Sequence, residues 1–113
     1  MGRVLLDKYE DGTVGAGATD LWTSPDVPDG QIWHVSKFGG GAIRAALVAL
    51  QVRTGVSPDV WKTIRAVAAP GSNEYEVNRD FVGDDVIKFR VVRRERSGED
   101  QPIIFWLEGY KVT

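Results

Sequence analysis

The chain has 113 residues and a formal net charge of −2, with 42% hydrophobic and 27% charged residues. This is the composition of one soluble globular domain, which we expect to span residues 1–113, and its charge gives no overall attraction to nucleic acid. The absence of cysteine excludes disulfides and thiolate metal sites. No run approaches the roughly 20 apolar residues that cross a bilayer, and no signal peptide is expected.

Short runs rich in Val, Ile, Trp, Tyr, Phe and Thr alternate with turn chemistry along the chain. Turns are expected at "EDGTVGAGATD", "SPDVPDG", "GGGA", "TGVSPD", "APGSN", "VGDD" and "SGEDQP". The intervening runs predict strands over 2–9, 19–24, 31–38, 45–53, 60–68, 73–78, 85–95 and 102–112. A helical turn at 42–46 is the alternative for one alanine-rich segment. The pattern predicts an all-β fold, an antiparallel β-sandwich with eight strands in a jelly roll.

Alternation identifies the core face of two of these strands. In "VIKFRVVR" the apolar positions fall on one face, opposite Lys88 and Arg90, and in "LVALQVR" they fall opposite Gln51 and Arg53. The predicted core residues are Val48, Leu50, Val52, Ile87, Phe89 and Val91.

The closing segment "PIIFWLEGYKVT" is apolar on both faces, unlike a half-buried strand. Ile103, Phe105 and Leu107 share one face, and the other face carries Ile104, Trp106, Tyr110 and Val112. A sandwich core covers only one set, and soluble monomers seldom expose a contiguous apolar patch. We therefore predict a homo-oligomer with Ile104, Trp106, Tyr110 and Val112 as interface candidates.

No catalytic, cofactor or metal site is predicted. His34 is the only histidine, and its alternating context "QIWHVSKF" is typical of a sheet residue. The serines show no Gly-x-Ser-x-Gly motif, and the glycine-rich stretches complete no phosphate-binding motif. A hydrolase would need a carboxylate pair converging in a cleft; the candidate pairs, all in expected turns, are Glu10 with Asp11, Asp84 with Asp85, and Glu99 with Asp100.

Basic residues gather in "KFRVVRRER", the best candidate for contact with a polyanion. They are Lys88, Arg90, Arg93, Arg94 and Arg96. Acidic residues follow closely (Glu95, Glu99 and Asp100), so a solvated face or a salt-bridged subunit contact is favoured, and no nucleic-acid partner is expected.

Four tryptophans are many for a domain of this size. Trp22, Trp33 and Trp61 are candidates for a ligand face, because carbohydrate-binding modules use aromatic platforms. A carbohydrate-binding module is therefore the alternative function, and coplanar exposed rings on one face would distinguish it from an assembly protein.

The segments "VPDGQIWHV", "ALQVRTG", "VGDDVIKFRVV" and "FWLEGYKV" together span most of the chain. In this pattern the chain resembles small bacteriophage virion proteins of the jelly-roll type, such as head decoration or fibre-associated proteins. The resemblance implies a non-enzymatic structural protein in the virion, a trimer, and partners such as the major capsid protein. The resemblance implies no catalytic residues in this chain.

Overall fold

The computed structural model describes residues 2–93 and 100–113, and within these ranges the fold is all-β, without a helix. Its seven strands are β1 (Arg3–Leu5), β2 (Lys8–Val14), β3 (Gly17–Thr23), β4 (Ile32–Thr54), β5 (Ser57–Phe81), β6 (Val86–Arg93) and β7 (Gln101–Val112). The alternative of a helical turn at 42–46 is wrong, because β4 continues through that segment.

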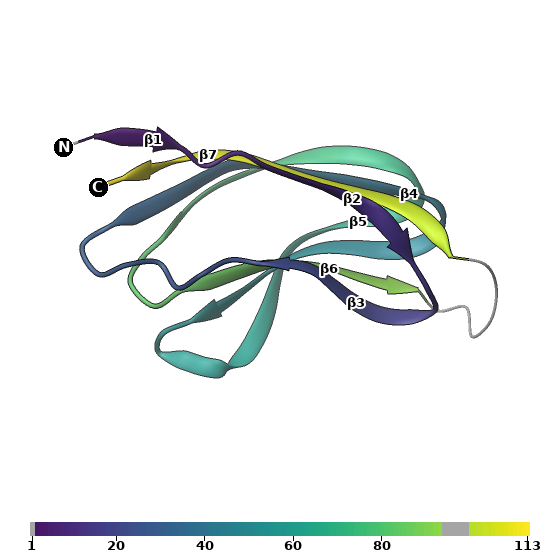
Figure 1. Cartoon of the computed structure of the whole chain (residues 1–113), viewed down its shortest axis with the longest axis horizontal. Coiled ribbons are helices and arrows are strands. Elements are labelled where there is room, and N and C mark those ends of the chain that lie inside the picture. Colours follow the sequence, from purple (N-terminus) through teal and green to yellow (C-terminus); the bar gives the residue numbers. More distant parts are fainter. Residues whose placement is uncertain (1, 94–99) are drawn as a thin grey trace.

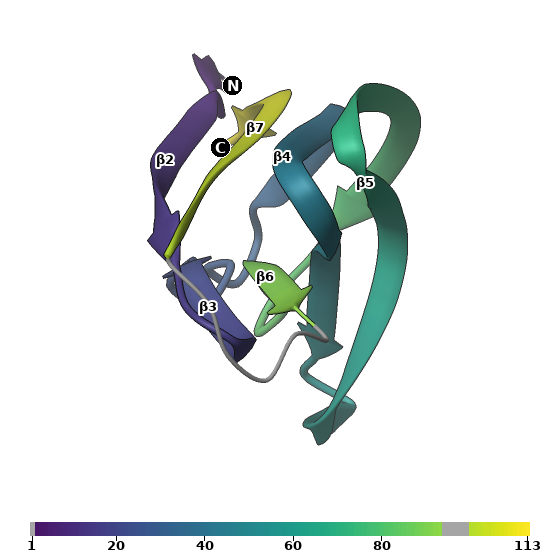
Figure 2. The same ribbon diagram turned by 90° about the vertical axis from the view of Figure 1, so that its right-hand side faces the viewer.

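Every strand pairing is antiparallel, in the order β1-β7-β4-β6-β3, with β2 also on β7 and β5 on β4. The long strand β4 changes partner along its length: Ile32–Ala42 pairs with β7, and Leu47–Arg53 pairs with β6. Because the register shifts between these stretches, the sheet curls and brings β7 and β6 to opposite sides of the molecule, as Figures 1 and 2 show.

Eight separate strands are not what the structure describes. The expected turn at "GGGA" lies within β4, where Gly39–Ala42 pairs with β7 on one side and β5 on the other. The expected turn at "APGSN" likewise lies within β5. The register between β4 and β5 shifts between Ala42 and Ala46, and pairing resumes on both sides of the shift. The chain therefore changes direction within these long strands. The expected first strand 2–9 is instead divided at Leu6, whose side chain is buried in the core.

Three phenylalanines from different strands join the two sides of the curled sheet. Phe89 of β6 stacks on Phe105 of β7 with ring centroids 4.8 Å apart, and Phe38 of β4 lies 6.2 Å from each. All six predicted core residues are buried around them, which confirms the core faces expected from alternation.

Candidate interaction surfaces

Strand β7 presents its two apolar sets to opposite sides. Ile103, Phe105 and Leu107 are buried in the core, whereas Ile104 and Trp106 alternate with them and are only partly buried. The second set thus faces away from the core, at the positions where the sequence placed the candidate interface.

Cross-strand pairing extends this outward set onto neighbouring strands. Tyr9 of β2 pairs with Trp106, Leu5 of β1 with Tyr110, and Ile32 of β4 with Val112. Leu5 is 76% exposed and Tyr9 59% exposed. We name this surface the β7 face, whose apolar residues are Leu5, Tyr9, Ile32, Ile104, Trp106, Tyr110 and Val112. The sequence could not reveal the first three, because their place depends on the register with β7.

Trp106 is held in position by groups of its own chain. Its indole lies against Gly39, its cross-strand partner, where a Cβ atom would collide with the ring. Its Nε1–H donates to Glu74 Oε2 over 2.7 Å, and Lys37 Nζ lies 3.9 Å from the other oxygen of that carboxylate. The ring is therefore held in one orientation by groups of its own chain.

Tyr110 lies in a second ordered group at the other end of the β7 face. Its ring stacks on His34 at 4.9 Å, and Arg3 lies over it with Cζ 4.4 Å from the centroid. His34 Nδ1 in turn lies 2.6 Å from Asp80 Oδ1. The histidine is thus a sheet residue engaged with its cross-strand neighbours, consistent with the interpretation from sequence.

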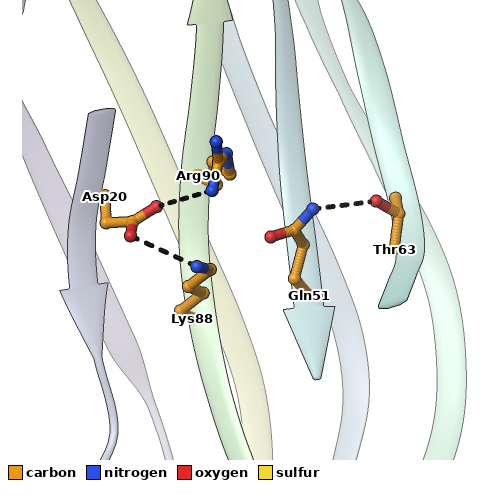
Figure 3. Close-up of polar contacts among 5 residues, drawn as sticks. All are labelled: Asp20, Gln51, Thr63, Lys88 and Arg90. Atoms are coloured by element: carbon orange, nitrogen blue, oxygen red, sulfur yellow. Dashed lines mark hydrogen bonds and ion pairs between the residues drawn. The ribbon is translucent and has the colours of Figure 1, made fainter. Parts of the chain in front are cut away.

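The opposite side of the molecule carries a polar surface, which we name the β6 face. Its polar residues include Asp20, Gln51, Thr63, Lys88 and Arg90 (Figure 3). Asp20 of β3 lies 3.2 Å from Lys88 Nζ and 3.8 Å from an Arg90 nitrogen, both in β6. Further along, Gln51 of β4 donates to Thr63 Oγ1 of β5 over 3.1 Å. Lys88 is only 4% exposed although it points away from the core, so its ammonium group depends on these neighbours for stabilisation.

The three ligand-face tryptophans do not share a surface. Trp61 belongs to the β6 face, with Lys88 Nζ 3.9 Å and Arg53 Cζ 5.3 Å from its ring. Trp33 is buried in the core. Trp22 packs against the core with its ring 5.2 Å from that of Phe89. A coplanar platform of these three rings is therefore not formed.

In the carboxylate pairs that the structure describes, Asp85 and Glu10 form local hydrogen bonds or ion pairs. Asp85 is buried, and its carboxylate accepts hydrogen bonds from the backbone N–H of Val82 at 2.9 Å and of Gly55 at 3.4 Å. Glu10 forms an ion pair with Lys8 at 2.8 Å. Glu99 lies outside the described residues. Within the described ranges no group of three or more His, Asp or Glu side chains could hold a metal ion.

The basic cluster is divided between two environments. Lys88 and Arg90 point to the β6 face, but Arg93 is buried and its guanidinium donates to the Val14 carbonyl over 2.8 Å. Arg94 and Arg96 lie outside the described residues. A continuous basic stripe is thus not seen across the described part of β6.

In residues 2–93 and 100–113 there is no helix of a length and apolarity that could span a membrane.

The strand pairing and core define an all-β protein built on one curled antiparallel sheet. No protein-family model and no curated protein sequence matches the chain.

Among solved structures, the core of Drosophila NLP is similar with a TM-score of 0.53 and 15% identity, covering 94% of this chain and 99% of that one. That structure is described as giving insight into pentamer formation and histone binding. Chains of infectious bursal disease virus also match with a TM-score of 0.53: the Gx strain at 9% identity over 98% of this chain, and the Gt strain at 7% over 96%. This chain spans only 32% and 31% of those virus chains. At these identities the likeness concerns the fold.

Proposed function

We propose that the chain is a non-enzymatic structural protein of a virus particle that self-associates through the β7 face. The observation that carries this proposal is the row of apolar side chains facing away from the core on β7, extended by Leu5, Tyr9 and Ile32. Such a row loses contact with water when a partner covers it, and burial of apolar area drives association. The likeness in fold to chains of a virus supports the same role.

The jelly-roll topology is part of this proposal. If β4 and β5 are each divided at their bends, the chain has two four-stranded halves, β2-β7-β4-β5 and β3-β6-β4-β5. The pairing of β4 with β7 first and β6 later supports this division. The two halves would then pack face to face through the three phenylalanines, as the layers of a sandwich do.

Sedimentation at micromolar concentration tests self-association. We expect the wild type to sediment as an oligomer, with the sequence resemblance favouring a trimer. Ile104→Lys should sediment as a monomer, because it places a charge in the apolar contact. Asp11 is the cross-strand neighbour of Ile104, so the new cation gains a partner within the monomer and the fold should be retained by circular dichroism.

Val60→Lys is the matched control, since Val60 of β5 is 51% exposed and does not belong to the β7 face. It should keep the wild-type mass. A monomeric wild type, or loss of association in the control alone, would contradict a contact through the β7 face.

The virion role has its own test. Mass spectrometry of purified particles of a virus that encodes the chain should detect it, together with the major capsid protein or a fibre protein to which it attaches. Its absence from such particles would overturn the virion assignment. Glycosidase or esterase activity of the purified protein that Asp85→Asn abolishes would overturn the non-enzymatic assignment.

A further inference from the structure

The β7 face carries an excess of negative charge around its apolar row. Its outward positions hold five carboxylates (Asp11, Glu74, Glu76, Asp80 and Glu108) and two basic side chains, Arg3 and Lys37. Glu76 and Glu108 are both register partners of Lys37, which is also the nearest cation to Glu74. Lys37 is therefore the neighbouring cation of three carboxylates, and the surface as a whole is acidic.

The β6 face has the opposite charge. Arg53, Lys88 and Arg90 point outward, and the carboxylate of Asp20 pairs with Lys88 and Arg90. Together these four side chains carry a positive charge, although the whole chain has a net charge of −2.

Each face combines a hollow with projecting side chains. Next to Arg90, the β6 face is hollowed by a depression of about 330 Å³ lined by Ala45, Ala46, Leu47, Ala68, Ala69 and Val92. Leu47 in this hollow is 45% exposed. The β7 face carries three bulky rings, those of Tyr9, Trp106 and Tyr110, beside a depression of about 290 Å³ whose lining includes Gly41, Ser72 and Ile104. The indole of Trp106 is fixed by Glu74.

From this complementarity we infer that the β7 face of one copy packs against the β6 face of the next copy. This inference rests on the proposed self-association and specifies its geometry. The acidic, aromatic surface would meet the more basic one, so that carboxylates of one copy face Arg53 and Arg90 of another. Such a contact is heterologous, because the two copies use different surfaces, and it generates a ring or an open filament.

A two-fold contact of the β7 face with itself is disfavoured by its charge. It would bring the five carboxylates of one copy against the same five of another, and juxtaposed like charges disfavour an interface. A self-contact of the β6 face would likewise oppose Arg53 and Arg90, its two partly exposed cations. Pairing the unlike faces removes both repulsions.

Variants of each face, studied singly and mixed, test the inference by sedimentation. Ile104→Lys blocks the β7 face. Arg53→Glu reverses a charge on the β6 face, close to Lys88 on the neighbouring strand. Each variant alone should be monomeric, whereas an equimolar mixture should form a heterodimer with one copy of each, because every variant keeps one intact face. Arg44→Glu, at an exposed position of the β4 bend where the register with β5 is interrupted, is the charge-matched control and should keep the wild-type mass.

If Arg53→Glu does not fold by circular dichroism, Leu47→Trp tests the same face by filling the hollow. A β6-face variant that folds and keeps the wild-type mass, while Ile104→Lys is monomeric, would overturn the heterologous contact and leave the proposed self-association intact. A mixture that stays monomeric would also overturn it. A monomeric wild type would instead overturn the proposed self-association itself.

Discussion

At the scale of single residues, the curling of the sheet brings side chains of different strands into close contact. Phe89 and Phe105 are fully buried and their rings are nearly parallel, with an interplanar angle of 1°. On the side of the sheet that faces away from the core, the Lys88 side chain is covered by Trp61 and Asp20. Aromatic rings therefore stabilise both the core and the β6 face.

Phe89→Ala should reduce the free energy of unfolding by about 3–5 kcal/mol, because it leaves a cavity between Phe38 and Phe105. Urea denaturation followed by circular dichroism measures the change. Phe89→Leu should cost less, since most of the volume is kept. A loss below about 1 kcal/mol for the alanine variant would show that this site is not tightly packed.

Gly39→Ala should displace the Trp106 indole from its hydrogen bond with Glu74, because the added methyl group occupies the space of the ring. We expect a loss of stability of about 1–3 kcal/mol from the strain and a change in tryptophan fluorescence. Gly12→Ala is the control, as the nearest atom to its new Cβ is Leu21 Cδ2 at 4.0 Å. Equal effects of the two substitutions would contradict the close packing of Trp106 on Gly39.

At the scale of elements, the bends and turns decide how the long strands are used. The turn from β5 to β6 is tied to other segments by Asp85, whose side chain binds the Gly55 amide and whose carbonyl accepts from the Val27 amide at 2.9 Å. Asp84 beside it has a positive φ of 68°, a conformation that Asp tolerates better than most residues. The motif "VGDD" thus serves as a structural turn.

Asp85→Ala should destabilise the protein by about 1–3 kcal/mol, because it leaves the Val82 and Gly55 amides without their acceptor. Asp84→Gly, the neighbouring control, should change stability by less than about 1 kcal/mol, since glycine adopts positive φ without steric strain. Thermal unfolding of the two variants provides the comparison. An equal or larger loss for Asp84→Gly would contradict the role assigned to Asp85.

At the scale of the whole molecule, the two sides of the curled sheet present unlike surfaces. The β7 face is acidic and rich in aromatic rings, whereas the β6 face carries Arg53, Lys88 and Arg90. Strands β7 and β6 lie on opposite sides of the curled sheet (Figure 1), so the inferred contact would let one copy bind two others at once.

The melting temperature of the wild type should rise with protein concentration, because association stabilises the folded state by mass action. Ile104→Lys should show no such dependence. Added salt should weaken association of the wild type, because it screens the charges that surround the contact. Calorimetry at several protein and salt concentrations tests both expectations, and a melting temperature independent of protein concentration would argue against self-association.

The sequence by itself determined the fold class, the core faces of β4 and β6, and the parity of β7, because alternation in a strand depends only on the neighbouring residues. It also placed Asp84 and Asp85 in a turn. It did not determine that "GGGA" continues a strand, since glycine is compatible with turns and with bends inside a sheet.

Only the tertiary structure decided which residues from other strands join Trp106 and which surround Lys88. Those neighbours depend on register between segments far apart in the chain, such as Gly39 with Trp106 and Asp20 with Arg90. A shift of one residue would reverse the faces, and no local pattern specifies the register. The unlike charges of the β7 and β6 faces arise in the same way, because each face collects side chains from several strands.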